Sequence, residues 1–260
     1  MTSPSTAEIL PVNNPENFGH SPWSIVHQCM PKIAAIVPAF NEETTVGHVV
    51  QALADSHVFD EIIVISDGST DKTAEVARSS GATTVHELPF HKGMGKSKGQ
   101  ALQHGVTHTD AQIIAFFDAD LIGLSSDHIH SLLDPVIAGT RYMNTAWRER
   151  GWLGNFIQHH LPLIGGERAM RREVFESIPD QFLRGFMIES AVNYYCRSND
   201  LPYGATPLRG LTMRKKYQKV GWGKALGEYA HMYWQVAKAM VVVRLHRKEF
   251  REHFVHDKHI

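Results

Sequence analysis

The chain has 260 residues, 43% hydrophobic and 20% charged, with 26 Lys and Arg against 27 Asp and Glu, which disfavours a disordered chain and fits one large globular domain or two small ones. The net charge of −1 hides a division: residues 1–140 hold 6 basic and 16 acidic residues, a net of −10, and residues 141–260 hold 20 basic and 11 acidic, a net of +9. Cys29 and Cys196 form no metal or disulfide pattern, and no apolar run after residue 140 approaches the roughly 20 residues that span a bilayer. The first 30 residues also lack the Lys or Arg of a secretory signal. We therefore expect a cytoplasmic protein.

Along the chain, residues 1–30 are rich in Pro, Ser and Asn and predict a mobile arm. From Pro31, short apolar runs alternate with amphipathic segments, an order that predicts a mostly parallel sheet with helices on both faces. The expected strands are Lys32–Val37, Glu61–Ile65, Thr83–His86 and Gln112–Phe117, and the expected helices are Glu43–Asp55, Asp71–Ser80, Lys98–Thr107 and Asp127–Ala138. After residue 140 we expect a strand at Arg141–Thr145 and helices at Ala169–Ser177, Met187–Arg197 and Gly223–Phe250.

Polar residues gather where the expected strands end, which is where parallel sheets bind ligands. Asp118 and Asp120 follow a buried strand, and two such carboxylates favour a hard divalent ion, Mg²⁺ or Mn²⁺, shared with phosphate oxygens. The alternative for this pair is a helix cap or a turn. Residues 91–99 place three Lys and three Gly at a helix entry, which suits a diphosphate, although a solvated charged loop explains the same composition.

Four segments taken in order resemble the motifs of family 2 glycosyltransferases with the GT-A fold: Val37–Glu43, Ser66–Asp71, Lys98–Leu102 and Phe117–Asp120. The resemblance implies a metal-dependent enzyme with a nucleotide-sugar donor, UDP- or GDP-linked, with UDP-glucose as an example. It implies that the donor-binding residues are Pro38, Ala39, Phe40, Glu42, Ser66, Asp67, Lys98, Asp118, Ala119 and Gly165, and that Asp120 and Asp118 hold Mg²⁺ or Mn²⁺. Ser66 departs from the family, which commonly has an acid there, so contacts to the base are in question.

The second half, in residues 163–172, 178–179 and 185–189, is similar to glucosyl-3-phosphoglycerate synthases and polyprenyl-phosphate glycosyltransferases. This resemblance implies that Glu189 binds the donor sugar and acts with Asp120 in catalysis; a helix N-terminal acid is the structural alternative for Glu189. Met213 stands where the subgroup has a metal-ligating His, and a thioether is a poor ligand for Mg²⁺ or Mn²⁺. The ion then keeps a water there, takes another His, or binds weakly.

Because Arg residues cluster after residue 140, we expect an anionic, phosphate-bearing acceptor such as 3-phosphoglycerate, bound by Arg148, Arg168, Arg171 and Arg214. A solvated basic surface is the alternative for this charge. The competing functions are a polyprenyl-phosphate glycosyltransferase at the inner membrane surface and a noncatalytic nucleotide-sugar binding protein. A sugar nucleotidyltransferase is disfavoured, because the loop after the first strand is acidic and lacks Gly.

The resulting domain division is an arm at 1–30, a GT-A domain at 31–222 with a nucleotide-sugar half at 31–140 and an acceptor half at 141–222, and a basic amphipathic helix at 223–260. That helix either docks on the core or contacts anionic lipid. The sequence does not decide whether the protein forms a homodimer, and no nucleic-acid partner is expected. Most of the 17 His, such as His104 and His108, stand singly on polar stretches, and they receive no role.

Overall fold

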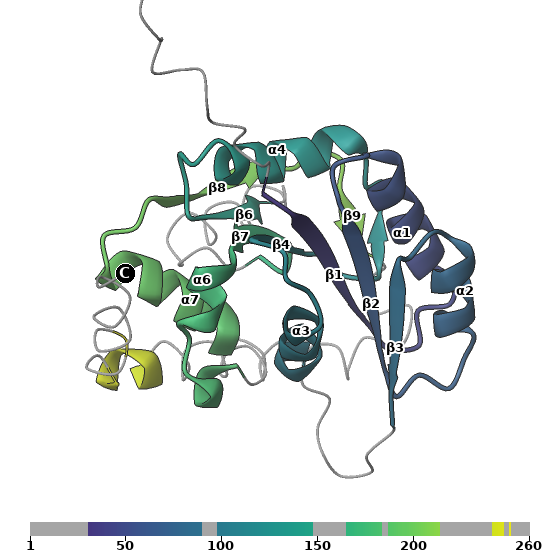
Figure 1. Ribbon diagram of the computed structural model, residues 1–260, viewed down its shortest axis with the longest axis horizontal. Helices are drawn as coiled ribbons and strands as arrows, with labels where there is room; N and C mark the ends of the chain where they lie inside the picture. The colour runs from purple at the N-terminus through teal and green to yellow at the C-terminus, as the bar shows by residue number, and fades with distance from the viewer. Residues whose placement is uncertain are drawn as a thin grey trace, which may run out of the picture. The chain divides into compact units, whose positions relative to one another are not determined.

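The computed structural model describes residues 31–89, 98–147, 165–183, 187–213, 241–246 and 250. Its centre is a seven-stranded sheet, drawn in Figure 1, with the strand order β3-β2-β1-β4-β7-β6-β8. The strands are β1 (Ile33–Ala39), β2 (Glu61–Asp67), β3 (Thr84–Leu88), β4 (Ile113–Phe116), β6 (Met143–Trp147), β7 (Arg168–Arg171) and β8 (Tyr203–Pro207). Only β7 runs antiparallel to its neighbours, so the expectation of a mostly parallel sheet is confirmed.

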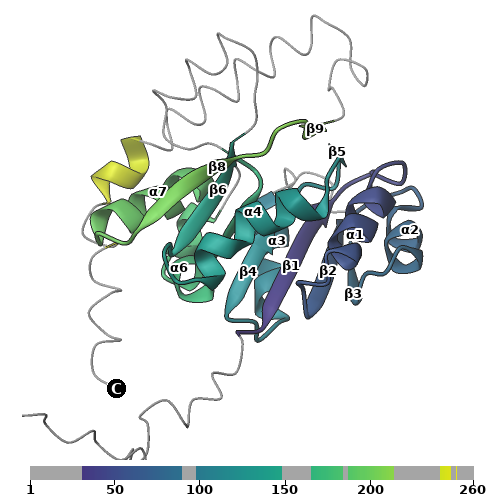
Figure 2. The ribbon, with the colours of Figure 1, turned by 90° about the horizontal axis from the view of Figure 1, so that it is seen from above.

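Helices cover both faces of the sheet, as Figures 1 and 2 show. On one face, α1 (Val46–Asp55), α2 (Thr73–Ser79) and α4 (Ser126–Ile137) pack on the odd-numbered side chains of β1. On the other, α3 (Lys98–Thr107), α6 (Arg172–Glu176), the short 3-10 helix η2 (Asp180–Phe182) and α7 (Met187–Ser198) pack on Ile36 and its neighbours in β2 and β4. The continuously apolar strands are therefore explained by two separate cores, one on each face.

Close backbone contact fixes the height of α3 on the sheet. A Cβ atom added at Gly105 would lie 2.5 Å from Cγ2 of Ile36 in β1, so the helix touches the strand where Gly has no side chain. The N-terminus of α3, at Lys98, then lies toward the carboxyl ends of the strands. The sequence therefore sets the position of Lys98 through a glycine two turns further along the helix.

The helix predicted at Ala169–Ser177 is wrong in its first half. Residues Arg168–Arg171 form β7, and only Arg172–Glu176 are helical. The backbone of β7 pairs with β4 on one side and β6 on the other, and Ala169 and Met170 are buried on opposite faces. Tertiary pairing thus overrides a local pattern too short to distinguish a strand from a helix.

The sequence analysis also missed three short strands. These are β8 and a separate two-stranded antiparallel sheet of β5 (Leu121–Ile122) and β9 (Thr212–Met213). Two-residue strands carry too little pattern to be seen in a sequence. The other predicted strands and helices up to residue 147, and α7, are confirmed to within a few residues at each end.

Most of the predicted C-terminal helix lies outside the described residues, and so does the N-terminal arm. Residues 241–245 are helical, and Val243 and Phe250 are buried in the core beside η2 and α7. The rings of Phe250 and Phe182 lie 5.0 Å apart between their centroids. This part of the segment therefore docks on the domain. Within the described residues, no helix has the length and apolar character needed to cross a membrane.

Candidate active site

Two loops at the carboxyl edge of the sheet are joined by a set of hydrogen bonds. The Asn41 backbone N–H donates to Oγ of Ser69 at 3.1 Å, and the side-chain oxygen of Asn41 accepts from the Thr70 N–H at 2.8 Å. In the same way, the Glu42 N–H donates to Oγ1 of Thr73 at 2.8 Å. Asn41 adopts the left-handed conformation, with φ of 52°, which Asn tolerates better than most residues. The polar motif residues of both loops therefore have a structural role, because they lock the loop after β1 to the loop after β2.

Asp71 completes this connection. Its carboxylate accepts from the backbone N–H groups of Glu43, at 3.2 Å, and Thr73, at 3.0 Å. Burial alone would raise the pKa of Asp71, but the hydrogen bonds from Thr73 and Glu43 outweigh it and hold the pKa below its ordinary value. Asp71 is therefore ionised at neutral pH and connects the two loops through its hydrogen bonds.

The predicted donor-binding residues line this locked edge. Ala39 ends β1 and pairs with Ser66 in β2, and both are buried. Phe40, Glu42 and Asp67 follow directly and are partly exposed. The buried Ser66 adds no charge where the family commonly has an acid. Pro38 and Ala119 lie beside these residues on β1 and after β4.

Lys98 and Asp118 form an ion pair at the same edge. The Lys98 ammonium, at the start of α3, contacts Oδ1 of Asp118, just after β4, and both side chains are partly shielded from solvent. Gly166 lies against this pair: an added Cβ would be 2.5 Å from Oδ2 of Asp118 and 3.0 Å from Nζ of Lys98. Gly165 is as tightly placed, since an added Cβ would lie 2.5 Å from the carbonyl oxygen of Ala146. The glycine pair thus lets the segment before β7 close over the ion pair.

Three further charges surround the pair, from Glu167, Arg168 and Glu189. Arg168 is 2% exposed and donates to the carbonyl oxygen of Gly165 at 2.8 Å. Burial lowers the pKa of Lys98, but the charges of Asp118, Glu189 and Glu167 and the hydrogen bond to Asp118 outweigh it, so the pKa is raised. Burial lowers the pKa of Arg168, against the opposite effect of Glu189, Glu167 and Asp118. Among the described residues, the cluster therefore contains three acidic and two basic side chains that interact electrostatically.

Glu167 was missed as a site residue by the sequence analysis, although it is fully buried beside these charges. A charged residue directly after a glycine pair was the available signal. A buried carboxylate requires compensating charge, so the Gly-Gly-Glu-Arg segment at 165–168 is better understood as one unit than as a glycine turn followed by a helix.

Asp120 is the second predicted metal ligand and lies in the turn directly before β5, partly exposed. β5 pairs with β9 so that Met213 lies opposite Leu121, and the Met213 side chain packs against the apolar core with it. This placement gives Met213 no support as a ligand. The donors available at this edge among the described residues are carboxylate oxygens, which fit Mg²⁺ or Mn²⁺ better than a softer ion.

The two predicted acceptor arginines that the structure describes, Arg168 and Arg171, lie at opposite ends of β7. Arg168 pairs with Phe116 near the carboxyl end of β4, whereas Arg171 pairs with Ile113 at the opposite end. The Arg171 guanidinium lies 4.5 Å from the ring centroid of Tyr142 and 3.7 Å from Glu173. Arg148 and Arg214 lie outside the described residues. Of the two predicted acceptor residues that the structure describes, Arg168 lies at the candidate active site and Arg171 does not.

A mostly parallel sheet flanked by helices, with carboxylates and a lysine at the carboxyl ends of its strands, defines a GT-A-type α/β protein. Residues 34–196 match glycosyl transferase family 2. Because that match spans more than half of the chain, the protein belongs to this family.

Among curated relatives, the chain is similar to the 4,4'-diaponeurosporenoate glycosyltransferase of Staphylococcus aureus (strain USA300). The two are 39% identical over 118 residues, which is 45% of this chain and 29% of that protein. The match thus spans less than a third of the relative's length.

Among solved structures, glucosyl-3-phosphoglycerate synthase from Mycobacterium tuberculosis with Mg²⁺ and UDP aligns with a TM-score of 0.67 at 24% identity, over 83% of this chain and 80% of that one. The same synthase with Mn²⁺, UDP-glucose and glycerol 3-phosphate aligns with a TM-score of 0.66 at 25% identity, over 83% and 81% of the two chains. These alignments confirm the expected GT-A fold.

Proposed function

We propose that this protein is a metal-dependent glycosyltransferase that moves a sugar from a nucleotide-diphosphate donor to an anionic acceptor. The observation that carries the proposal is the charge cluster at the carboxyl edge of the sheet, in which Lys98, Asp118, Glu167, Arg168 and Glu189 interact. It lies beside the two locked loops that the family resemblance assigns to the donor.

The charge balance of the cluster supports metal dependence. Among the described residues of the cluster, Asp118, Glu167 and Glu189 oppose Lys98 and Arg168, and Asp120 two residues beyond Asp118 adds a fourth acid. With all groups ionised, the excess is two negative charges, which repels a diphosphate. A divalent ion held by Asp120 and Asp118 would remove that excess and would stabilise the leaving diphosphate.

The donor sugar is assigned to Glu189. Glu189 lies in the first turn of α7, near enough to Lys98 and Arg168 that its charge acts to raise the pKa of each. A carboxylate accepts two sugar hydroxyls, and fixed neighbours on α3 and β7 would hold it in one orientation. Glu189 then positions the sugar carbon for attack, and Lys98 holds the Asp118 carboxylate beside the nucleoside.

An anionic acceptor is supported by Arg168 and by the solved synthase that contains UDP-glucose and glycerol 3-phosphate. The curated relative is named for a different acceptor, 4,4'-diaponeurosporenoate. That name denotes a carboxylate, so this acceptor is also an anion. Where the attacking group is itself a phosphate or carboxylate, it is already ionised and requires positioning more than a general base, whereas the hydroxyl of a glycerate acceptor requires a base in an inverting reaction.

The test is a mass-spectrometric screen of UDP- and GDP-sugars against 3-phosphoglycerate, a polyprenyl phosphate, an apolar carboxylate and a neutral sugar, with Mn²⁺ or Mg²⁺. We expect glycosylated product with an anionic acceptor, and its loss in Glu189→Gln. The matched control is Glu176→Gln, because Glu176 is exposed on α6 and pairs with Arg172 away from the cluster.

Equal transfer to neutral and anionic acceptors would refute the acceptor class. Donor binding without turnover of any acceptor would identify the noncatalytic alternative instead. NMR of the product's anomeric carbon then decides between retention and inversion of configuration, which the residues of the site leave open.

A further inference from the structure

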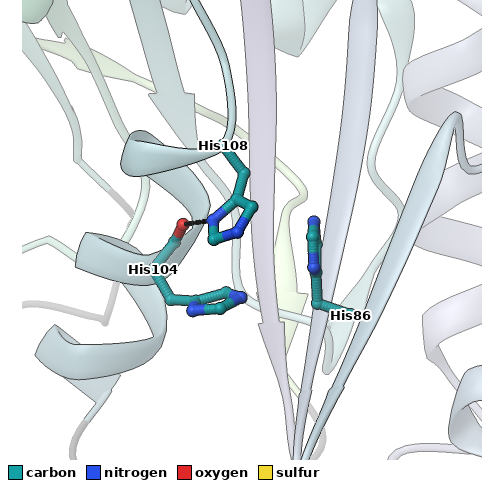
Figure 3. Close-up of side chains that lie close together, drawn as sticks. All are labelled: His86, His104 and His108. Atoms are coloured by element: carbon teal, nitrogen blue, oxygen red, sulfur yellow. Dashed lines mark hydrogen bonds between the residues drawn. The ribbon is translucent and has the colours of Figure 1, made fainter.

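Three histidines converge near the C-terminal end of α3, whereas the candidate active site lies at its N-terminal end. His104 lies in the last turn of α3, His108 directly follows the helix, and His86 lies in the edge strand β3. One ligand nitrogen from each ring lies within 4.8 Å of the other two. Figure 3 shows the rings of His104 and His108 turned toward His86 across the gap between helix and strand. Residues far apart in the chain thus form a compact imidazole cluster.

The helix spacing is one that metal sites use. His104 and His108 are four residues apart, so their side chains lie on one face, and the strand supplies a third ring. Their ring centroids lie 4.1 Å apart, and those of His86 and His108 lie 4.5 Å apart. Three imidazoles with a fourth position open to water is a coordination set suited to zinc and neighbouring ions.

One hydrogen bond selects the nitrogen that faces the cluster. Nδ1 of His108 lies 2.7 Å from the backbone carbonyl oxygen of His104, the contact drawn as a dashed line in Figure 3. A carbonyl oxygen only accepts, so Nδ1 carries the proton and Nε2 keeps its lone pair. Metal-ligating histidines are commonly oriented by such a bond from the other ring nitrogen to a carbonyl.

The other two rings carry unsatisfied nitrogens. Nε2 of His86 and Nε2 of His104 are buried and have no hydrogen-bond partner among the described residues. Burial, with a smaller effect of nearby His108, lowers the pKa of both rings and favours their neutral form. A buried polar atom without a partner costs free energy, and a bound cation would remove that cost. His108 is exposed, so the cluster has an opening to solvent.

We propose that His86, His104 and His108 form a binding site for a first-row transition-metal ion, with Zn²⁺ as the preferred occupant. Zinc–nitrogen bonds of about 2.1 Å in a tetrahedron separate the nitrogens by roughly 3.4 Å, so the cluster must contract by about 1.4 Å at its widest, which rotations of the rings can supply. All three donors are neutral nitrogens, which suit Zn²⁺ rather than Mg²⁺.

A bound ion would connect α3 to the edge of the sheet. His104 lies six residues beyond Lys98, about 9 Å along the helix axis, so the ion stays clear of the charge cluster. It would fix the C-terminal end of the helix whose N-terminal end carries Lys98. The site is therefore separate from the candidate active site, and it is independent of whether the protein transfers sugars.

The test uses the full chain, stripped with EDTA and titrated calorimetrically with Zn²⁺ in excess Mg²⁺, which fills carboxylate sites. The variants are His108→Ala, His86→Gln and the control His48→Ala, an exposed histidine on α1. We expect one tight zinc ion per chain in the unaltered protein and in the control. Loss of a ligand should weaken that binding at least about 100-fold, since even second-shell losses cost 10–100-fold.

A thermal-melting series keeps the result interpretable, because the other 14 of the 17 histidines can also bind zinc. Zn²⁺ should raise the Tm of the unaltered protein and of His48→Ala, but not that of His108→Ala, whose metal-free Tm should be unchanged because the side chain is exposed. Equal zinc affinity in the unaltered protein and His108→Ala would overturn the proposal. So would the absence of any tight binding, which would make the cluster a stack of imidazole rings.

Discussion

Replacing Gly166 with Ala perturbs the candidate active site through a single methyl group. The new Cβ would lie 2.5 Å from Oδ2 of Asp118, against 3.4 Å for an ordinary contact, so the carboxylate must move by about 0.9 Å. Gly166 does not occupy the left-handed region, so the Ala backbone itself is unstrained. The Asp118 side chain yields before the backbone does, and its ion pair with Lys98 is displaced with it.

The expected magnitude follows from that displacement. A misplacement of about 1 Å in a catalytic constellation costs roughly 100-fold in rate, equivalent to about 2.7 kcal/mol of transition-state stabilisation. The free energy of unfolding should change by no more than about 1 kcal/mol, because the ion pair that is lost is partly exposed. Gly166→Ala should therefore separate activity from stability.

Gly105→Ala is the matched control with the opposite outcome. Its added Cβ would lie 2.5 Å from Cγ2 of Ile36 in the buried core, and overpacking of this kind costs about 1–3 kcal/mol of folding stability. The assay compares kcat/KM under saturating Mn²⁺ with Tm for both variants. If Gly166→Ala keeps full kcat/KM, the position of Asp118 is unimportant for transfer. If Gly166→Ala instead loses as much Tm as Gly105→Ala, the glycine serves packing.

Three further predictions test other parts of the site. Asp120→Asn should lower kcat/KM at least about 100-fold, and EDTA should abolish turnover reversibly, as measured by transfer before and after Mn²⁺ is restored. Asp71→Ala should lower the free energy of unfolding by about 1–3 kcal/mol at pH 7, measured by urea titration. The Asp71 pKa is lowered on folding, so its contribution is present above pH 3.8, and the difference between variant and unaltered protein should shrink as the pH falls below that value. Arg171→Gln should leave the acceptor KM unchanged, because Arg171 lies at the opposite end of β7 from the site; a raised KM would contradict this placement.

The first half of the fold could be predicted from the sequence because each strand there is a continuous apolar run followed by a polar loop. Ile33–Ala39 and Glu61–Asp67 are buried on both faces, which leaves little ambiguity with a surface helix. The second half lacks this signal. β7 is four residues long, carries an Arg at each end, and depends on pairing with strands on both sides. Such an element is specified by tertiary contacts rather than by its own pattern.

For the candidate active site, the polar residues at the strand ends predicted its location, but they did not predict which side chains contact one another there. Asp118 and Lys98 were each assigned to the donor, yet their direct ion pair follows from the height of α3 on β1 and was not foreseeable. The histidine cluster beside α3 likewise depends on a contact that the sequence does not reveal. His104 and His108 have helical spacing in the sequence, but His86, which completes their cluster, lies on a strand whose pairing with β2 brings it alongside.

The net positive charge of residues 141–260 does not make the candidate active site positive. Several arginines of the basic half serve the fold: Arg141 donates to Asn144 at 2.7 Å, Arg172 pairs with Glu176 at 2.6 Å, and Arg171 lies against Tyr142. Arg168 reaches the cluster, but it faces acids contributed by both halves. Local charge at the described site is therefore negative although the surrounding half is basic, and a divalent ion rather than the arginine count is what would admit an anionic substrate there.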